Sequence, residues 1–178
     1  MVLMCGVAGA GKTTFARRLE DAGYVRLSID EEVWQVFGRF GIDYSPHRYE
    51  HFSAVAEERL RDRLVSLIGA GANVVVDLSL WQKEGRDTYK RLIEMAGAVW
   101  RLVYLPVPPD ELRRRLAARS VRFDANAAFP IDETLLAHYI ASFQVPMGEG
   151  EEVITWPPSS EAPISPAPIG RLPSDPSA

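Results

Sequence analysis

Short apolar runs alternate along this chain with longer stretches in which apolar residues recur every three or four positions. The runs have the length of strands, and the spacing in the longer stretches is that of amphipathic helices. Strands that alternate with helices indicate an α/β fold with a parallel sheet, because each helix carries the chain back to start the next strand. The pattern predicts strands at 2–5, 24–29, 73–77, 99–105 and 152–156, and helices at 12–22, 30–37, 49–68, 81–96, 108–120 and 131–143.

The proline content divides the chain near its end. Residues 157–178 contain seven prolines among serines and alanines, and a segment of this composition cannot bury enough apolar surface to form a core. The chain has 178 residues, 47% of them hydrophobic, which fits one globular domain. We therefore expect one domain over residues 1–156, followed by a proline-rich tail over residues 157–178.

The first apolar run leads directly into a phosphate-binding loop. Residues 6–13 read Gly-Val-Ala-Gly-Ala-Gly-Lys-Thr, the complete Gly-x-x-x-x-Gly-Lys-Thr motif between a predicted strand and a predicted helix. Glycine backbone can wrap a phosphate closely with its N–H groups turned inward, and the following helix N-terminus adds a positive field. Lys12 then reaches the β- and γ-phosphates, and the Thr13 hydroxyl binds Mg²⁺. A plain strand-to-helix turn would require neither residue, so the motif predicts a bound nucleoside triphosphate, held by Gly6, Ala8, Gly9, Ala10, Gly11, Lys12, Thr13 and Thr14.

Two aspartates follow predicted strands, and each has two interpretations. Asp77 ends an apolar strand and would hold the hydration shell of Mg²⁺ beside Thr13, or it would cap the next helix. The phosphate-binding loop favours the metal role. Asp30 follows the second strand at the same carboxyl edge, where open parallel sheets bind ligands. It would accept the proton of an attacking hydroxyl group, cap its helix, or do both.

Five arginines lie within residues 113–122, after the fourth predicted strand. Arg115 and Arg119 share one face of the predicted helix, while Leu112 and Leu116 share the buried face. The planar guanidinium group neutralises charge that is spread over several phosphate oxygens, although a solvated basic face is the common alternative for any single arginine. The clustering favours at least one arginine that closes on the phosphates.

In their order along the chain, these motifs resemble those of phosphate-loop kinases. The loop, Asp30, Val-Val-Val-Asp77 and the spacing of Arg115 and Arg119, with the stretch 77–92, resemble small bacterial kinases of the zeta-toxin and polynucleotide-kinase-like group. The resemblance extends over residues 1–156. It implies a three-layer α/β/α P-loop NTPase fold, with a five-stranded parallel sheet in the order 2-3-1-4-5 and an arginine-bearing helical lid over residues 108–130. It also implies ATP and Mg²⁺ as cofactors.

The resemblance assigns roles to individual residues. Asp30 becomes the substrate-side base, and Thr13 and Asp77 become the metal-binding residues. Arg86 would contact a substrate or a phosphate. The catalytic set is then Lys12, Asp30, Arg115, Arg119 and Arg122, with Arg119 and Gly150 also placed at the nucleotide.

Residues 34–52 combine aromatic, histidine and arginine side chains in a glycine-bounded segment, a composition that suits a ring-bearing or sugar-like acceptor. Some of these aromatic residues, Trp34 among them, have the helical spacing of core residues instead. The predicted substrate contacts are Asp30, Trp34, Arg48, Ser79 and Arg86.

The charge balance argues against two classes of partner. A net charge of −4 and a pI of about 5.4 provide no overall basic field for nucleic acid or for an anionic membrane. No apolar run approaches the roughly 20 residues that span a bilayer. The single cysteine, Cys5, fits a reducing compartment, so we expect a cytoplasmic protein.

These features predict an ATP- and Mg²⁺-dependent kinase that transfers the γ-phosphoryl group to a hydroxyl of a small molecule. An antibiotic, a nucleotide, a sugar and a nucleotide-sugar all fit as the acceptor. One alternative is a polynucleotide 5′-hydroxyl kinase, against which the acidic balance counts. The other is a regulatory nucleotide-binding module without transfer activity.

Overall fold

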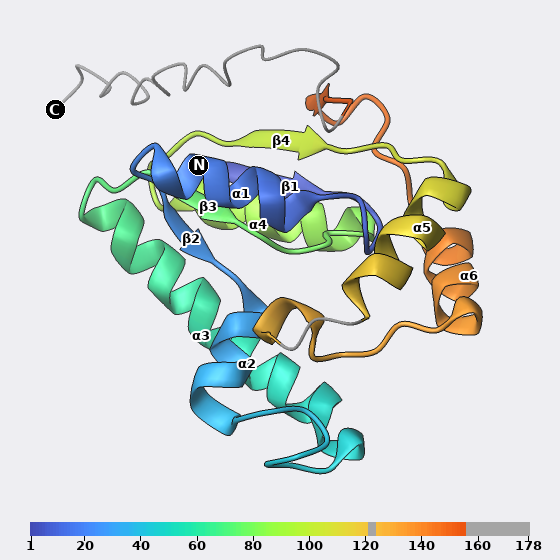
Figure 1. Cartoon of the computed structure of the whole chain (residues 1–178). Helices are drawn as coiled ribbons and strands as arrows, with labels where there is room; N and C mark the ends of the chain where they lie inside the picture. Colours follow the sequence, from blue (N-terminus) through green and yellow to red (C-terminus); the bar gives the residue numbers. More distant parts are fainter. Residues whose placement is uncertain (121–123, 156–178) are drawn as a thin grey trace, which may run out of the picture.

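Five short strands form one parallel sheet in the computed structural model, which describes residues 1–120 and 124–155 (Figure 1). The strand order is β2-β3-β1-β4-β5, and every pair of neighbours is parallel. This confirms the order 2-3-1-4-5. The strands are β1 (Val2–Cys5), β2 (Val25–Leu27), β3 (Val74–Val76), β4 (Arg101–Tyr104) and β5 (Glu151–Val153).

Helices cover both faces of this sheet and complete the predicted three layers (Figure 1). The alternation within β1 separates the two cores, because successive side chains of a strand point to opposite faces. Val2 and Met4 pack with α1, α5 and α6, whereas Leu3 and Cys5 pack with α3 and α4. The helices are α1 (Lys12–Asp21), α2 (Ile29–Phe37), α3 (Tyr49–Gly69), α4 (Lys83–Met95), α5 (Pro109–Arg119) and α6 (Glu133–Ser142), with short 3₁₀ helices η1 (Pro46–Arg48) and η2 (Ala125–Ala127).

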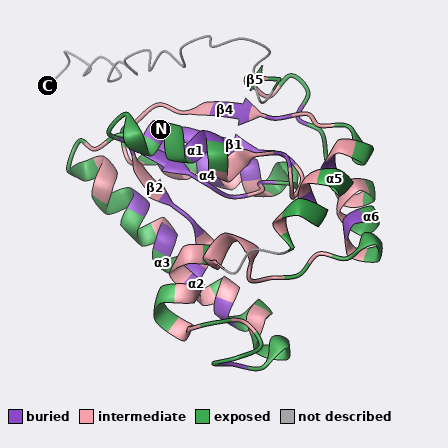
Figure 2. Cartoon of the chain, viewed as in Figure 1, coloured by how far each residue is buried: buried purple, intermediate pink, exposed green. Residues whose placement is uncertain are grey.

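The central strands read as continuous apolar runs because both of their faces are buried. All four residues of β1 and all three of β3 are buried, which Figure 2 shows as purple at the centre of the molecule. The edge strand β5 is intermediate or exposed. Burial thus decreases from the centre of the sheet to its edge.

Two element boundaries differ from the predicted ones at places that matter for the site. The second strand ends at Leu27 and not at residue 29, because the Ser28 hydroxyl accepts a hydrogen bond from the Glu31 N–H and so begins α2. The helix predicted from residue 81 begins at Lys83, after an irregular segment over residues 77–82.

Two predictions concern the extent of the domain and a possible membrane span. The tail predicted over residues 157–178 lies outside the described residues, so the division of the chain at residue 156 stays a prediction. Among residues 1–120 and 124–155, no helix combines the length and the apolar content that crossing a membrane would require.

Candidate active site

A cavity of about 1170 Å³ lies at the carboxyl end of the sheet. Its walls come from the segments that follow β1, β2 and β3 and from α5, α3 and α4. The volume exceeds the roughly 1,000 Å³ at the upper end of pockets for a single small ligand. The cavity is therefore large enough for a nucleotide together with a second molecule.

The phosphate-binding loop wraps around the N-terminus of α1 at one wall of this cavity. Gly9 has φ +86° and Gly11 has φ +99°, a backbone conformation in which side-chain-bearing residues are strained. A Cβ on Gly9 would also lie 3.1 Å from the Leu116 side chain of α5. Both glycines are thus required by the local geometry, which turns the loop toward the first N–H groups of α1.

Lys12 is the first residue of α1, and its ammonium group folds back over the loop. Its Nζ donates hydrogen bonds to the carbonyl oxygens of Gly6, at 2.8 Å, and Val7, at 3.1 Å. Burial lowers the pKa of Lys12, and the nearby charge of Asp77 opposes this shift. These two contacts hold one cation against the phosphate-binding loop, where it can attract a phosphate group.

Thr13 and Asp77 converge on the same wall. Both residues line the cavity, and the nearby Thr13 hydroxyl is one of the groups that oppose the burial-driven rise in the pKa of Asp77. Asp77 does not cap a helix, because α4 begins at Lys83 with Gln82 as its N-cap. The two side-chain oxygens fit a hard cation that prefers oxygen ligands and keeps several waters, so they could hold Mg²⁺.

Arg26 supports Asp77 from within the sheet. Its guanidinium group donates to Asp77 Oδ2 at 2.8 Å and also bonds to Glu31, and the Arg26 side chain is only 3% exposed. Glu31 in turn accepts a hydrogen bond from the Asn126 side chain at 3.1 Å. A continuous polar network therefore connects Asp77 to the segment after α5. Sequence reasoning missed Arg26, although a lone charge within an apolar strand was the available signal.

Asp30 lies in the first turn of α2 and lines the cavity. Since Ser28 is the N-cap, the capping interpretation of Asp30 is eliminated. Asp30 Oδ1 accepts a hydrogen bond from the Tyr49 hydroxyl at 3.1 Å. Burial raises the pKa of Asp30, while the Tyr49 hydrogen bond and the charges of Arg119 and Lys12 oppose the rise. The cavity thus holds a carboxyl group with a raised pKa beside cations, the setting in which a carboxylate acts as a general base.

Two arginines of α5 reach the cavity. The Arg115 guanidinium donates to the Ala10 carbonyl oxygen of the phosphate-binding loop at 3.1 Å, and Arg119 donates to the Phe129 carbonyl oxygen at 3.3 Å. Phe129 stacks on Tyr49 with ring centroids 4.7 Å apart. The described part of the predicted lid is thus packed against both the loop and the Asp30 wall.

The cavity brings together most, but not all, of the predicted site residues. Those that line it are Ala8, Gly9, Gly11, Lys12, Thr13, Thr14, Asp30, Asp77, Ser79, Arg115 and Arg119. Gly6 and Ala10 lie in the same loop but behind its surface, where a Gly6 Cβ would meet the Leu105 carbonyl oxygen at 3.1 Å. Arg122 lies outside the described residues.

Four predicted contacts do not line this cavity. Arg86 is fully buried in an ion pair with Glu149, and Gly150 lies against the Trp100 ring. Arg48 lies over the Phe52 ring, and Trp34 lines only a narrow cleft behind Asp30.

The predicted acceptor segment, residues 34–52, is mostly a small core of its own. Phe37 stacks on Phe52 at 4.0 Å, and Tyr44 meets the Phe52 ring edge-on at 5.0 Å. The aromatic residues therefore hold α2 and α3 together, and within this segment Tyr49 is the residue that lines the cavity. Further lining residues come from α3, the segment before α4, α4, the lid and α6: Ser53, Glu57, Arg61, Trp81, Thr88, Tyr89, Phe129 and Tyr139.

Comparison with known proteins gives one family and many similar structures. The family model AAA_33, described as an AAA domain, matches residues 1–146. APS kinase CysC from Mycobacterium tuberculosis, in complex with AMPPNP and APS, is 18% identical, with a TM-score of 0.56 over 89% of this chain and 88% of that chain. A gluconokinase from Sinorhizobium meliloti 1021 is 23% identical, with a TM-score of 0.52 over 86% of this chain and 81% of that chain.

A structure of the Pnkp1/Rnl/Hen1 RNA repair complex contains a chain that is 19% identical, with a TM-score of 0.56 over 80% of this chain. This chain spans 45% of that one, and 38% of its counterpart in a second structure of the complex. No curated protein matches. At these identities the similar structures establish the fold.

Proposed function

The chain belongs to the AAA_33 family of P-loop kinase domains, and from this premise we propose that it transfers the γ-phosphoryl group of ATP to a hydroxyl group of a small molecule. The observation that carries the proposal is the position of Asp30. Its carboxyl group lines the same cavity as Lys12 and the phosphate-binding loop. A protein that only binds nucleotide has no need of a base on the acceptor side of the phosphates.

The nucleotide end of the cavity is supplied by the loop and α5. Backbone N–H groups at the start of α1 and the Lys12 ammonium group would hold the phosphates of ATP. Arg115 and Arg119 would neutralise the charge that spreads over the oxygens of the transferring group. Thr13 and Asp77 would hold Mg²⁺, which supplies further charge neutralisation when it is bound.

Asp30 acts at the acceptor end. The acceptor oxygen forms a bond to the γ-phosphorus, the bond from that phosphorus to the β–γ bridging oxygen breaks, and the hydroxyl proton passes to the Asp30 carboxylate. Desolvation inside the cavity raises the pKa of Asp30, which makes it a stronger base than an aspartate of ordinary pKa. Phe129 and Tyr49, stacked beside Asp30, would exclude water from this end, so that the acceptor and not water is phosphorylated.

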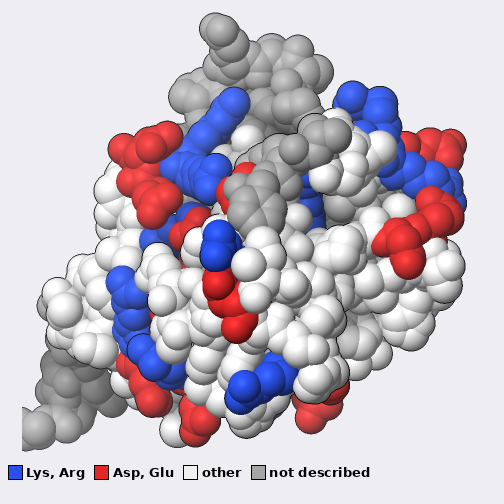
Figure 3. Space-filling view, turned by 60° about the horizontal axis from the view of Figure 1, so that its bottom comes forward, with Lys and Arg blue, Asp and Glu red and all other residues white. Residues whose placement is uncertain are grey.

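The surface supports a small acceptor over an oligonucleotide. Acidic and basic side chains are interspersed on the face shown in Figure 3, in place of the continuous basic track that a nucleic-acid backbone favours. The similarity to the RNA repair complex keeps a polynucleotide 5′-hydroxyl kinase as the second candidate.

One experiment separates these candidates. The protein with Mg²⁺ and γ-labelled ATP is offered a panel of sugars, nucleosides, nucleotide-sugars, aminoglycosides and 5′-hydroxyl oligonucleotides. Label on a small molecule supports the proposal, and label only on oligonucleotides supports the second candidate. Tight binding of ATP without any labelled acceptor refutes both and favours a regulatory module.

A further inference from the structure

The segment between β3 and α4, residues 77–82, borders the cavity, and its backbone is held from outside at successive positions. Ser79, Leu80 and Trp81 all line the cavity, and Leu80 is otherwise buried. Each of these three residues has its carbonyl oxygen bonded to a different part of the chain. The donors are Gly6 N–H to Ser79 at 3.2 Å, Arg86 Nη1 to Leu80 at 3.0 Å, and Gln144 N–H to Trp81 at 2.9 Å.

Leu80 is the strained position of this segment. Its φ is +40°, and among residues 1–120 and 124–155 it is the one non-glycine residue with positive φ. Such a conformation persists only where the surrounding structure holds it, and it often occurs at functional sites. Relaxing it would rotate the peptide groups that join Leu80 to Ser79 and to Trp81, both of which also line the cavity.

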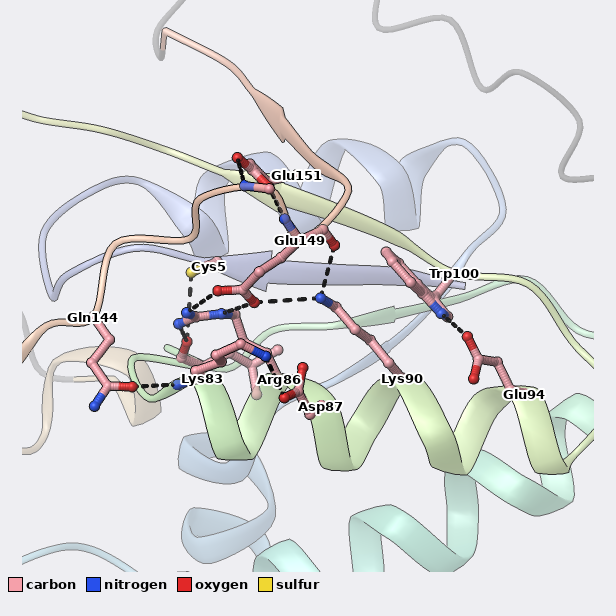
Figure 4. Close-up of polar contacts among 12 residues, drawn as sticks. Cys5, Lys83, Arg86, Asp87, Lys90, Glu94, Trp100, Gln144, Glu149 and Glu151 are labelled. Carbon is pink, nitrogen blue, oxygen red and sulfur yellow. Dashed lines mark hydrogen bonds and ion pairs between the residues drawn. The ribbon is translucent and has the colours of Figure 1, made fainter.

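Arg86 is the charged group that holds Leu80. It rises from the first turns of α4 beneath the sheet and is fully buried (Figure 4). Its Nε and Nη2 donate to the two carboxylate oxygens of Glu149, at 2.8 and 2.6 Å, which leaves Nη1 for the Leu80 carbonyl oxygen. This bidentate contact fixes the plane of the guanidinium group. The single ammonium nitrogen of a lysine lacks the planar fork that makes all three contacts.

Glu149 has a second cationic partner, Lys90. The Lys90 ammonium group, one helical turn along α4, donates to the Glu149 carbonyl oxygen at 2.9 Å and lies 3.4 Å from its carboxylate. Arg86 and Lys90 lower the pKa of Glu149 to about 2, so its charge persists at neutral pH. Figure 4 shows both cations pointing from α4 to this carboxylate.

We propose that Arg86, locked by Glu149, is a positioning residue that holds the Ser79–Trp81 backbone in its strained conformation and so sets the acceptor wall of the cavity. The chain of contacts runs from Glu149 through Arg86 and Leu80 to Trp81. The assignment rests on the proposed function only in calling this wall the acceptor side. The competing interpretation is an ion pair that merely joins the turn before β5 to α4.

The two interpretations differ in what happens to Trp81 in a folded variant. The protein is labelled with 5-fluorotryptophan, and the Trp81 resonance is assigned with Trp81→Phe. Glu149→Gln and Arg86→Lys are compared with Asp87→Asn, a matched control that removes a carboxylate charge from a more exposed ion pair on the same helix. Trp34, in α2, is the internal reference.

We expect the Trp81 fluorine resonance to shift or broaden in Glu149→Gln and in Arg86→Lys, with the Trp34 resonance unchanged and Asp87→Asn like wild type. With an acceptor from the panel, the same two variants should lose on the order of tenfold or more in transfer rate, the scale of a misplaced site wall. A Trp81 resonance identical to that of Asp87→Asn in either folded variant overturns the proposal. The resonance needs no kinase activity, so failure of the acceptor panel refutes the proposed function alone.

Discussion

Replacing Arg26 with Met tests the polar network beneath the proposed metal site. The Arg26 and Asp77 side chains are each 3% exposed and are joined at 2.8 Å. Methionine occupies a similar space without charge, so the substitution leaves the Asp77 carboxylate buried without this partner. The stability cost should therefore come from an unpaired charge and not from a cavity.

The expected cost is large for a single substitution. Breaking a buried ion pair by removing one partner costs about 3–5 kcal/mol, out of a typical total stability of about 5–15 kcal/mol. At roughly 2–4 °C per kcal/mol for a domain of this size, the melting temperature should fall by about 6–20 °C. Arg39→Met is the control, because the Arg39–Asp43 pair has side chains 46% and 38% exposed and should cost at most about 1 kcal/mol.

Thermal and urea denaturation followed by circular dichroism measure both variants. The double variant Arg26→Met/Asp77→Leu should recover most of the lost stability, because it also removes the buried carboxylate that the single variant leaves without its partner. If Arg26→Met is no less stable than Arg39→Met, or if the double variant is the least stable of all, the network does not hold the charge of Asp77 as described.

Three further predictions concern the cavity. Tyr49→Phe removes a hydrogen bond that lowers the pKa of Asp30, so the pKa of Asp30 should rise further. Activity is lost as the pH falls through the pKa of Asp30, because the protonated carboxyl group cannot accept the hydroxyl proton. The acid limb of the kcat/KM profile should therefore move to higher pH. Arg115→Ala should lower kcat by about 10²–10³-fold, whereas Arg113→Ala, whose partners are surface carboxylates, should change it less than about twofold in steady-state assays. Gly9→Ala combines positive φ with a Cβ 3.1 Å from an α5 side chain, strain of about 1–3 kcal/mol, and should weaken Mg·ATP binding by about tenfold in calorimetry.

Local signals in the sequence were sufficient for the fold and for the nucleotide end of the site. The phosphate-binding motif lies within eight consecutive residues, and the apolar runs of the strands are short and continuous. The resemblance to phosphate-loop kinases then supplied the order of the sheet, which the structure confirms. Asp30 and Asp77 could be placed at one edge because each follows a strand.

The partners of Arg86 and Arg26 could not be predicted in the same way. Arg86 lies in an otherwise amphipathic helix, and its partner Glu149 is 63 residues away, so only the packing of α4 beneath the sheet brings them together. Arg26 meets Asp77 across 51 residues. A charged residue in a helical pattern is usually solvated, and sequence alone gives no measure of which charges are buried with a partner.

The acceptor role of residues 34–52 was predicted from composition alone, and composition does not distinguish a binding pocket from a small core. Phe37 and Phe52 are stacked at 4.0 Å, which uses their faces for packing. Tyr49 differs because its hydroxyl reaches Asp30 while its ring meets Phe129. Composition therefore could not distinguish Tyr49, which lines the cavity, from the other aromatic residues of this segment.

The central claim is that Asp30 accepts the proton of a small-molecule hydroxyl group, and a paired measurement on wild type and Asp30→Asn tests it most directly. Phosphoryl transfer from γ-labelled ATP to an acceptor identified in the panel is measured alongside the affinity for Mg·ATP. The account predicts that Asp30→Asn binds Mg·ATP as wild type does but transfers about 10²–10⁴-fold more slowly, the usual contribution of a general base. Equal transfer rates in the two proteins, or release of inorganic phosphate as the only product of wild type, would contradict it.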